Sequence, residues 1–313
     1  MSVHEQFGVR RPGLLVESKL FNAARPTVTL LVEAGFDERF WRMHVAPSCI
    51  VRHQDQGGRA AAIAKLDEAP SHPDAVFLAV LDADLDRLEG RLSERGDIVW
   101  TDANDLEATL VFLPALKKLV LMKLDPTVLR DKQQAWGESI MERLVRHACG
   151  MGRLRWYKQR ALISDIVFVK SGKGTHKGSL RRFDKYQDCC DNDWSPSLGH
   201  LVDAIINYSN AQFLNKSALI EGIQGLPDTA PKQICNGHDL VGFLLSWLTS
   251  LSRSYVGNAE QLSDELALAC ERTWLEATDM WAAIKAWEAR HPGHLILRQP
   301  EHFEKKSESD AVQ

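Results

Sequence analysis

Short continuous apolar runs alternate with segments of helical spacing in the first part of the chain. Between these runs, Phe36 and Phe40 recur at the spacing of one helix face, and the turn at Gly57 and Gly58 opens a second helical segment. Strands that alternate with helices predict a parallel β-sheet with helices on its faces. The runs with the apolar character of buried strands are residues 27–32, 50–51, 75–81 and 98–101.

The pattern becomes mainly helical after the sequence LDPTVL, which marks a break. Residues 238–251 are apolar on nearly every face, and this predicts a central buried helix. A long helix is expected to begin after Asn258, with one core-facing stripe that runs from Leu262 to Ile284. Two further segments of this region are amphipathic, residues 131–149 and 197–215.

These patterns together predict the domain organisation and the fold class. We expect an α/β domain at residues 1–125, with a Rossmann-like parallel sheet and flanking helices, followed by a mainly α-helical domain at residues 126–305. The polar residues 306–313 are expected to form a disordered tail. Three tryptophans near the end of the helical region are expected to pack in the core or against another subunit: Trp274, Trp281 and Trp287.

Carboxylates recur where three of the predicted strands end. The first strand is followed by Glu33, and the third is followed by Asp82 and Asp84. In parallel α/β sheets, ligands bind at the carboxyl ends of the strands. Alternate residues of a strand point to the same side, so Asp82 and Asp84 would point to one place if the strand continued through them. The fourth strand is followed by Asp102, Asp105 and Glu107.

Such a group of carboxylates needs a compensating positive charge. Like charges at close range repel, and burial of unpaired carboxylates costs several kcal/mol. A divalent cation removes this conflict, and hard carboxylate oxygens suit Mg²⁺ or Mn²⁺. The sequence therefore predicts a metal site at the carboxyl edge of the sheet.

The motifs that carry these acids resemble those of a known family. A strand that ends in glutamate and a later strand that ends in DxD are typical of TOPRIM domains. The sequence LLVEAGFDERFW is similar to the first TOPRIM motif, and LDADLD is similar to the second. With TDANDLE and NGHDLVGFLL, the chain resembles the TOPRIM nucleases of the OLD type that are encoded beside ABC-type ATPases in bacterial anti-phage islands, including the PARIS system.

The resemblance implies roles for individual residues. Glu33 would be a metal ligand or a general acid–base, and Ala34 replaces the glycine that usually follows this glutamate. Asp86 would cap a helix or support the site rather than bind the metal. The remaining metal ligands that the resemblance implies are Asp37, Asp82, Asp84, Asp105 and Glu107.

The resemblance also implies an activity and partners. Two cations held by these acids would activate water and stabilise both the attacking and the leaving oxygen when a phosphodiester is cleaved. The chain would act as a toxic effector, restrained by an ABC-type ATPase sensor, and would cleave RNA such as host tRNA, or DNA. A second copy of the chain is a further possible partner. Two alternatives stay open: a DxD phosphohydrolase, and a non-catalytic TOPRIM-like module that binds a partner.

Two other segments carry candidate chemistry. Residues 170–182 are rich in glycine and positive charge, which suits phosphate contacts, although a solvated loop has the same composition. His238 and Asp239 stand at an expected helix start, where a capping role or a satisfied buried pair is favoured over catalysis. The candidate nucleic-acid contacts in the basic segment are Lys170, Lys173, Lys177, Arg181 and Arg182.

Composition limits the remaining possibilities. The net charge of the 313-residue chain is −4, so a nucleic-acid contact must come from a local basic patch. No apolar run reaches the roughly 18 residues that span a bilayer, and the sequence MSVHEQFGVRR lacks the apolar core of a signal peptide. The six cysteines contain no CxxC pair, which predicts reduced thiols and a cytoplasmic protein.

Overall fold

Contacts along the chain divide it into two compact units. The computed structural model describes residues 27–53, 58–69, 75–161, 168–169, 177–178, 186–190, 197–209, 215–251 and 257–299. The first unit comprises the described residues of Met1–Asp82, Ser93–Trp100 and Glu276–Gln313, and the second comprises those of Ala83–Leu92 and Thr101–Leu275.

The first unit contains a four-stranded, wholly parallel sheet, as the alternation of strands and helices predicts. The strand order is β2-β1-β3-β4, so β1 lies between β2 and β3. Its helices are α3 (Gly35–His44), α4 (Gly58–Glu68) and α15 (Asp279–Arg290). The strands are β1 (Val28–Val32), β2 (Cys49–His53), β3 (Val76–Leu81) and β4 (Ile98–Trp100).

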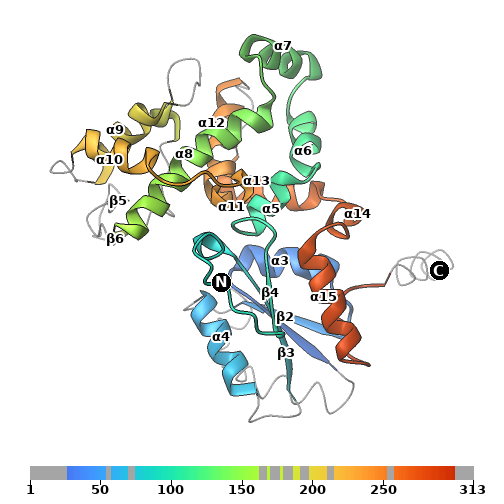
Figure 1. Ribbon diagram of the computed structural model, residues 1–313. Coiled ribbons are helices and arrows are strands. Elements are labelled where there is room, and N and C mark those ends of the chain that lie inside the picture. Colours follow the sequence, from blue (N-terminus) through green and yellow to red (C-terminus); the bar gives the residue numbers. More distant parts are fainter. Residues whose placement is uncertain are drawn as a thin grey trace, which may run out of the picture. The chain divides into compact units, whose positions relative to one another are not determined.

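Helices cover both faces of this sheet, with α4 on one face and α15 on the other (Figure 1). On the α4 face, Leu31 and Phe77 pack in one apolar cluster with Ala62 and Leu66 of the helix. Alternate strand residues point to opposite faces, and burial of both sets explains why the strand runs are continuously apolar. Phe36 and Phe40 of α3 are buried, as their spacing predicts.

The third strand ends before the acidic residues. β3 stops at Leu81, and Asp84 adopts φ 46°, in the left-handed region that aspartate tolerates better than most residues. Asp84–Asp86 forms a short 3₁₀ turn, η2. The strand therefore does not continue through Asp82 and Asp84, so the condition on which a common side-chain direction was expected is not met.

The second unit is mostly helical. The bounds of α12 confirm the predicted apolar helix after residue 237, and nine of its residues are buried. Two short strands, β5 (Phe168–Val169) and β6 (Lys177–Gly178), pair antiparallel. The other elements of the unit are α5 (Leu106–Phe112), α6 (Ala115–Lys123), α7 (Pro126–Trp136), α8 (Ile140–Arg160), η4 (Tyr186–Cys189), α9 (Leu198–Ser209), α10 (Lys216–Gln224), α11 (Pro231–Ile234), α12 (Gly237–Leu251), α13 (Ala259–Ala269) and α14 (Arg272–Leu275).

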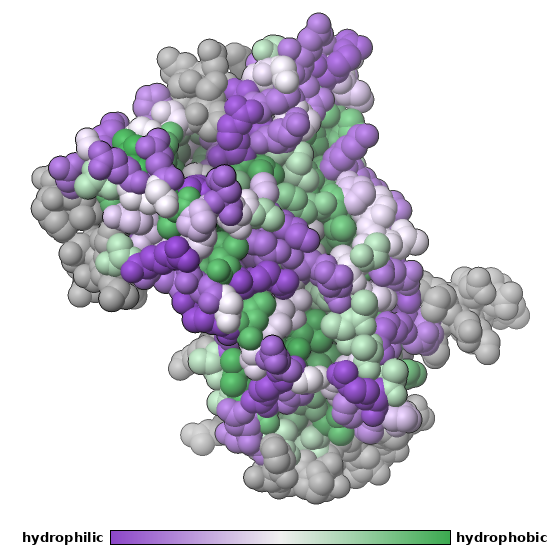
Figure 2. Space-filling model, viewed as in Figure 1, coloured by the Kyte–Doolittle hydropathy of each residue, from purple (hydrophilic) through white to green (hydrophobic). Residues whose placement is uncertain are grey.

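Helix α7 illustrates how local residues set the ends of these helices. It begins at Pro126 after an Asp125 cap and ends where Gly137 adopts φ 68°. Its only buried residue is Leu129, and the surface over the helix is largely hydrophilic (Figure 2). Helix α8 then begins after Ser139, which forms a capping box with Glu142.

The prediction of one long helix after Asn258 is wrong. Asn258 does cap a helix, because its side chain accepts the N–H of Gln261, but α13 ends at Ala269. Cys270 has extended backbone, and Thr278 caps a separate helix, α15, by accepting the N–H of Trp281. The expected core-facing stripe is interrupted at the same place. Leu266 of α13 and Trp281 of α15 are buried, but Thr273 and Ala277 between them are exposed.

The two units do not follow the predicted boundary near residue 125. Helices α5 and α6 belong to the second unit, whereas α15 returns to the first unit and packs against β4. Trp281 and Trp287 of α15 are buried in that core, as predicted. The predicted tail, residues 306–313, lies outside the described residues. Within the described part of the chain, no helix has both the length and the apolar character that a membrane span requires.

The C-terminal segment after α15 supplies a test of this division. Leu297 is fully buried and forms a β-bridge with Val45, whereas Leu295, two residues earlier, is 41% exposed. Leu297→Ala should lower the free energy of unfolding by about 2–5 kcal/mol, because it leaves a cavity in a packed core. The matched control Leu295→Ala should change it by only about 0.5 kcal/mol. Urea denaturation measures both, and equal effects would contradict the assignment.

Candidate functional site

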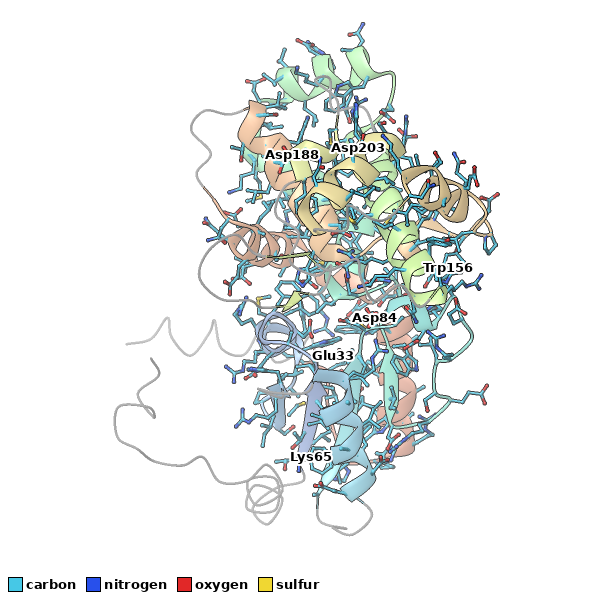
Figure 3. All side chains as sticks on the ribbon, turned by 90° about the vertical axis from the view of Figure 1, so that its left-hand side faces the viewer. Glu33, Lys65, Asp84, Trp156, Asp188 and Asp203 are labelled. Carbon is cyan, nitrogen blue, oxygen red and sulfur yellow. The ribbon has the colours of Figure 1, made fainter. Side chains whose placement is uncertain are left out.

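Glu33 lies at the carboxyl end of the central strand pair in the first unit. It follows the last residue of β1 directly, and its side chain is only 12% exposed. Its Oε1 atom accepts a hydrogen bond from the backbone N–H of Asp82 at 3.0 Å. Asp82 follows β3, the parallel neighbour of β1, so the sheet register brings the two acidic positions together. Figure 3 shows Glu33 and, farther down the same unit, Lys65 of α4.

Arg59 also binds Glu33, and the sequence analysis missed it. Its Nε donates to Glu33 Oε1 at 3.2 Å, and its Nη2 donates to the Asp82 carbonyl oxygen at 2.6 Å. The guanidinium carbon lies 5.5 Å from the ring centroid of Trp100. Trp100 is the last residue of β4 and lies at the same edge of the sheet. The sequence QGGR after β2 could have identified Arg59. A residue at the start of the helix that follows a parallel strand lies at the carboxyl edge of the sheet.

The glycine before Arg59 allows this approach. Gly58 adopts φ 47°, and a Cβ at this position would lie 3.8 Å from Glu33 Oε2. Left-handed backbone is unfavourable for residues with a side chain. Gly58 therefore places the start of α4 beside the Glu33 carboxylate and orients Arg59 toward it.

The oxygen chemistry of this edge fits a magnesium site. Mg²⁺ is usually held through one or two carboxylates, while water and substrate phosphates complete its shell. Glu33 and Asp82 supply such carboxylates at adjacent strand ends. Among the residues that the structure describes, no three His, Cys, Asp or Glu side chains form a metal-binding group by themselves. A cation here would complete its shell with water, and with phosphate oxygens when a substrate is bound.

Asp37 has a local structural contact. It lies in the first turn of α3, is buried, and its Oδ2 accepts the N–H of Ala34 at 3.0 Å. This bond satisfies one of the N–H groups that a helix start leaves without a partner. Because Ala34 has no polar side chain, the capping contact at this end of the helix comes from Asp37.

The end of β2 carries a histidine–glutamate pair that the sequence analysis did not identify. His53 is the last residue of β2, and its Nδ1 and backbone N–H both contact Glu38 Oε2. Arg42 contacts the other oxygen of Glu38. Burial acts to raise the pKa of Glu38, but the hydrogen bonds from His53 and the positive charges lower it overall. Glu38 is therefore held as a carboxylate at this edge of the first unit.

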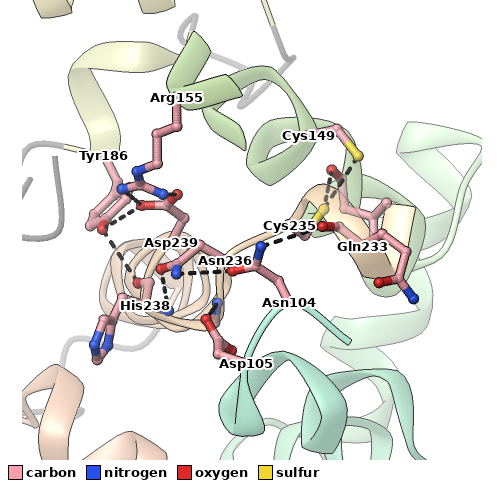
Figure 4. Close-up of polar contacts among 12 residues, drawn as sticks. Asn104, Asp105, Cys149, Arg155, Tyr186, Gln233, Cys235, Asn236, His238 and Asp239 are labelled. Carbon is pink, nitrogen blue, oxygen red and sulfur yellow. Dashed lines mark hydrogen bonds and ion pairs between the residues drawn. The ribbon is translucent and has the colours of Figure 1, made fainter. Parts of the chain in front are cut away.

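In the second unit, Asp105 joins two helices. It caps α5 by accepting the N–H of Ala108 at 2.7 Å, and it also accepts the N–H of Gly237 at 2.7 Å from the start of α12 (Figure 4). Burial, and next the neighbouring Glu107, raise the pKa of Asp105 to about 8. A side chain at Gly237 would collide with Asp105 and Glu107, so only glycine permits this contact.

Glu107 and the residues at the start of α12 form a polar group beside this contact. Glu107 is buried, and its Oε1 lies 3.7 Å from His238 Nδ1, whose side chain is 57% exposed. Asp239 is completely buried and forms an ion pair with both terminal nitrogens of Arg155. The Tyr186 hydroxyl donates to Asp239 Oδ1 at 3.1 Å (Figure 4). Asp239 therefore pairs with Arg155 in the core, and His238, the partner that the sequence suggested, is largely exposed.

The acidic turn after β3 has partners within the second unit. The Asp84 N–H donates to the Asn104 carbonyl oxygen at 2.6 Å. Asp86 Oδ1 accepts from Arg91 Nε at 2.9 Å and from Arg91 Nη2 at 2.7 Å. This ion pair holds Asp86 within the turn, and its expected role as a cap or as a support of the site stays a prediction.

The predicted basic patch is not placed by the structure. Lys177 belongs to β6, but its side chain is not among those described. The other candidates lie outside the described residues: Lys170, Lys173, Arg181 and Arg182. Their contact with nucleic acid therefore stays a prediction.

Comparison with known proteins adds no family. No protein-family model matches the chain, and no curated protein matches it. The resemblance to TOPRIM nucleases is therefore a resemblance of motif residues alone. Of these, Glu33 and Asp82 lie at the ends of adjacent parallel strands.

The buried Asp105 predicts a pH-dependent stability. Its folded pKa of about 8 lies above the unfolded value of about 4, so the folded state retains a proton that the unfolded chain releases. The stability that this proton contributes is full below about pH 4 and is lost as the pH rises through about 8. Asp105→Asn retains an oxygen acceptor but does not titrate, so its stability relative to wild type should increase with pH.

Urea midpoints at about pH 5 and about pH 8 measure this difference. Asp131→Asn, at an exposed position on α7, is the matched control and should show no such trend. A stability difference between Asp105→Asn and wild type that stays constant with pH would show that Asp105 is ionised in the folded protein.

Proposed function

We propose that this protein is a Mg²⁺- or Mn²⁺-dependent nuclease of the TOPRIM type. The observation that carries the proposal is the contact between Glu33, at the end of β1, and Asp82, at the end of the parallel neighbour β3. A glutamate and an aspartate at these two strand ends are what the TOPRIM motifs require. The resemblance in sequence is to AriB, the effector of the PARIS anti-phage system.

The proposed chemistry assigns distinct tasks to these acids. Divalent cations, when bound, would polarise the scissile phosphodiester and make a bound water more acidic. Glu33 would orient the attacking water and accept its proton, because it lies at the sheet edge with one oxygen fixed by the Asp82 N–H. The buried strands on either side hold this carboxylate at a defined place, which favours a single orientation of the nucleophile.

Asp82 and Asp84 are the proposed metal ligands together with Glu33. Two peptide bonds separate them, so covalent geometry keeps their Cα atoms within about 7 Å of each other. The left-handed backbone at Asp84 sets the direction of the second carboxylate independently of β3. Asp37 and Asp105 are better assigned to helix capping, because each accepts backbone N–H groups. Glu107 remains a candidate ligand through its place in the motif.

The biological setting that we propose follows the same resemblance. The nuclease would be a toxic effector in the cytoplasm, restrained by an ABC-type ATPase sensor like AriA and released during infection. Host tRNA is the proposed substrate, and DNA is the alternative polynucleotide. The proposal includes a substrate contact through the basic segment at residues 170–182.

Substitution of Glu33 tests the enzyme assignment. Glu33→Gln keeps the shape and hydrogen-bonding oxygen of the side chain but removes its charge and basicity. Cleavage of total tRNA or plasmid in Mg²⁺ should fall by about 100-fold or more, and Asp82→Asn should have a similar effect. Gel electrophoresis of the products and their dependence on EDTA measure the activity.

The exposed Glu94 provides the matched control. Glu94→Gln removes one surface charge of the same unit and should leave cleavage unchanged. Equal cleavage by wild type and Glu33→Gln would overturn the assignment. Absence of cleavage by wild type, together with an intact toxic phenotype in Glu33→Gln, would favour the non-catalytic partner-binding alternative.

A further inference from the structure

Arg59 is the positive group closest to the proposed catalytic glutamate in the contacts described above, and the inference here rests on the proposed function. Its side chain is 19% exposed and spans two acceptors at adjacent strand ends, Glu33 Oε1 and the Asp82 carbonyl oxygen. The fork of the guanidinium permits this double contact, which a lysine could not reproduce. Arg59 thus links the ends of β1 and β3 on the α4 side of the sheet.

The hydrogen bonds at Glu33 Oε1 leave little room for another ligand on that atom. A carboxylate oxygen offers about two lone pairs, and Oε1 already accepts the Arg59 Nε–H and the Asp82 N–H. A cation that coordinates Oε1 must therefore replace one of these donors. The Asp82 N–H is part of the backbone that follows β3, whereas the Arg59 Nε–H belongs to a side chain with several rotatable bonds. Arg59 is the donor that can leave.

Charge favours the same exchange. A divalent cation at Glu33 would lie within a few Å of the guanidinium, and two positive groups at that distance repel. The contact with the Trp100 ring would keep Arg59 near the carboxyl edge of the sheet after it leaves Glu33. The first turn of α4 contains no acidic residue, so its N–H groups add positive potential at this point.

We propose that Arg59 occupies the cation position in the metal-free protein and binds the substrate phosphate once a cation has displaced it. In the first state the guanidinium neutralises Glu33 and keeps it oriented. In the second state the same guanidinium contacts a phosphate oxygen of the polynucleotide, for which its planar fork is suited. Metal binding and substrate binding are then coupled through one side chain.

Metal titration without nucleic acid tests the first state. Isothermal titration calorimetry of Mn²⁺ into the full chain compares wild type with Arg59→Gln, which removes the competing charge. Arg59→Gln should bind Mn²⁺ at least about fivefold more tightly. Arg59→Lys retains the charge, so its Mn²⁺ affinity should lie closer to wild type.

Cleavage kinetics test the second state. Both Arg59→Gln and Arg59→Lys should raise the KM for the polynucleotide by roughly tenfold, since each loses the paired contact to phosphate. The matched control is Arg95→Gln, which removes an arginine that pairs with Asp97 just before β4, in the same unit. This control should change neither the Mn²⁺ affinity nor the KM.

The outcomes separate this inference from the proposed function. Equal Mn²⁺ affinity in wild type and Arg59→Gln, with Glu33-dependent cleavage intact, would overturn the role of Arg59 alone. Absence of Mn²⁺ binding in both proteins would overturn the proposed metal-dependent function itself. Circular dichroism verifies the folded state of each variant, and if Arg59→Gln does not fold, an unchanged KM in Arg59→Lys would overturn the inference.

Discussion

The hydrogen bond from the Asp82 backbone to Glu33 is the contact on which the proposed site depends. It exists because β1 and β3 are parallel neighbours in register and end at the same edge of the sheet. Apolar residues on both faces hold the strands in place, so the position of the carboxylate is set by the core beneath it. A partly buried charge is tolerated there because Arg59 and a backbone N–H compensate it.

Buried carboxyl groups in the second unit have different kinds of partners. Asp239 is fully enclosed but pairs with Arg155 and receives the Tyr186 hydroxyl, so its charge is neutralised within the core. Among the described residues, Asp105 accepts hydrogen bonds from two backbone N–H groups, and burial raises its pKa. Removal of one partner from either contact would leave a buried polar group uncompensated. Asp105 accepts an N–H group at the start of each helix, so it constrains where α5 and α12 begin.

Several acids that appeared equivalent in the motif therefore have different physical roles. Asp37 and Asp105 satisfy N–H groups at helix starts, and Asp86 pairs with Arg91 in the turn after β3. Glu33 and Asp82 combine a strand end, partial burial and contact with a neighbouring acidic position. The distinction depends on which donors each carboxylate meets, and one-dimensional spacing does not contain that information.

The sequence by itself determined the strands, the parallel sheet, the apolar helix α12 and the prominence of Glu33 and Asp82, because continuous apolar runs and chain order constrain all of these. Only the tertiary structure decided the end of β3, the breaks between α13 and α15, and the return of α15 to β4. It also revealed Arg59, which is 26 residues from Glu33 along the chain. Such contacts depend on packing between distant segments, and local periodicity is insensitive to it.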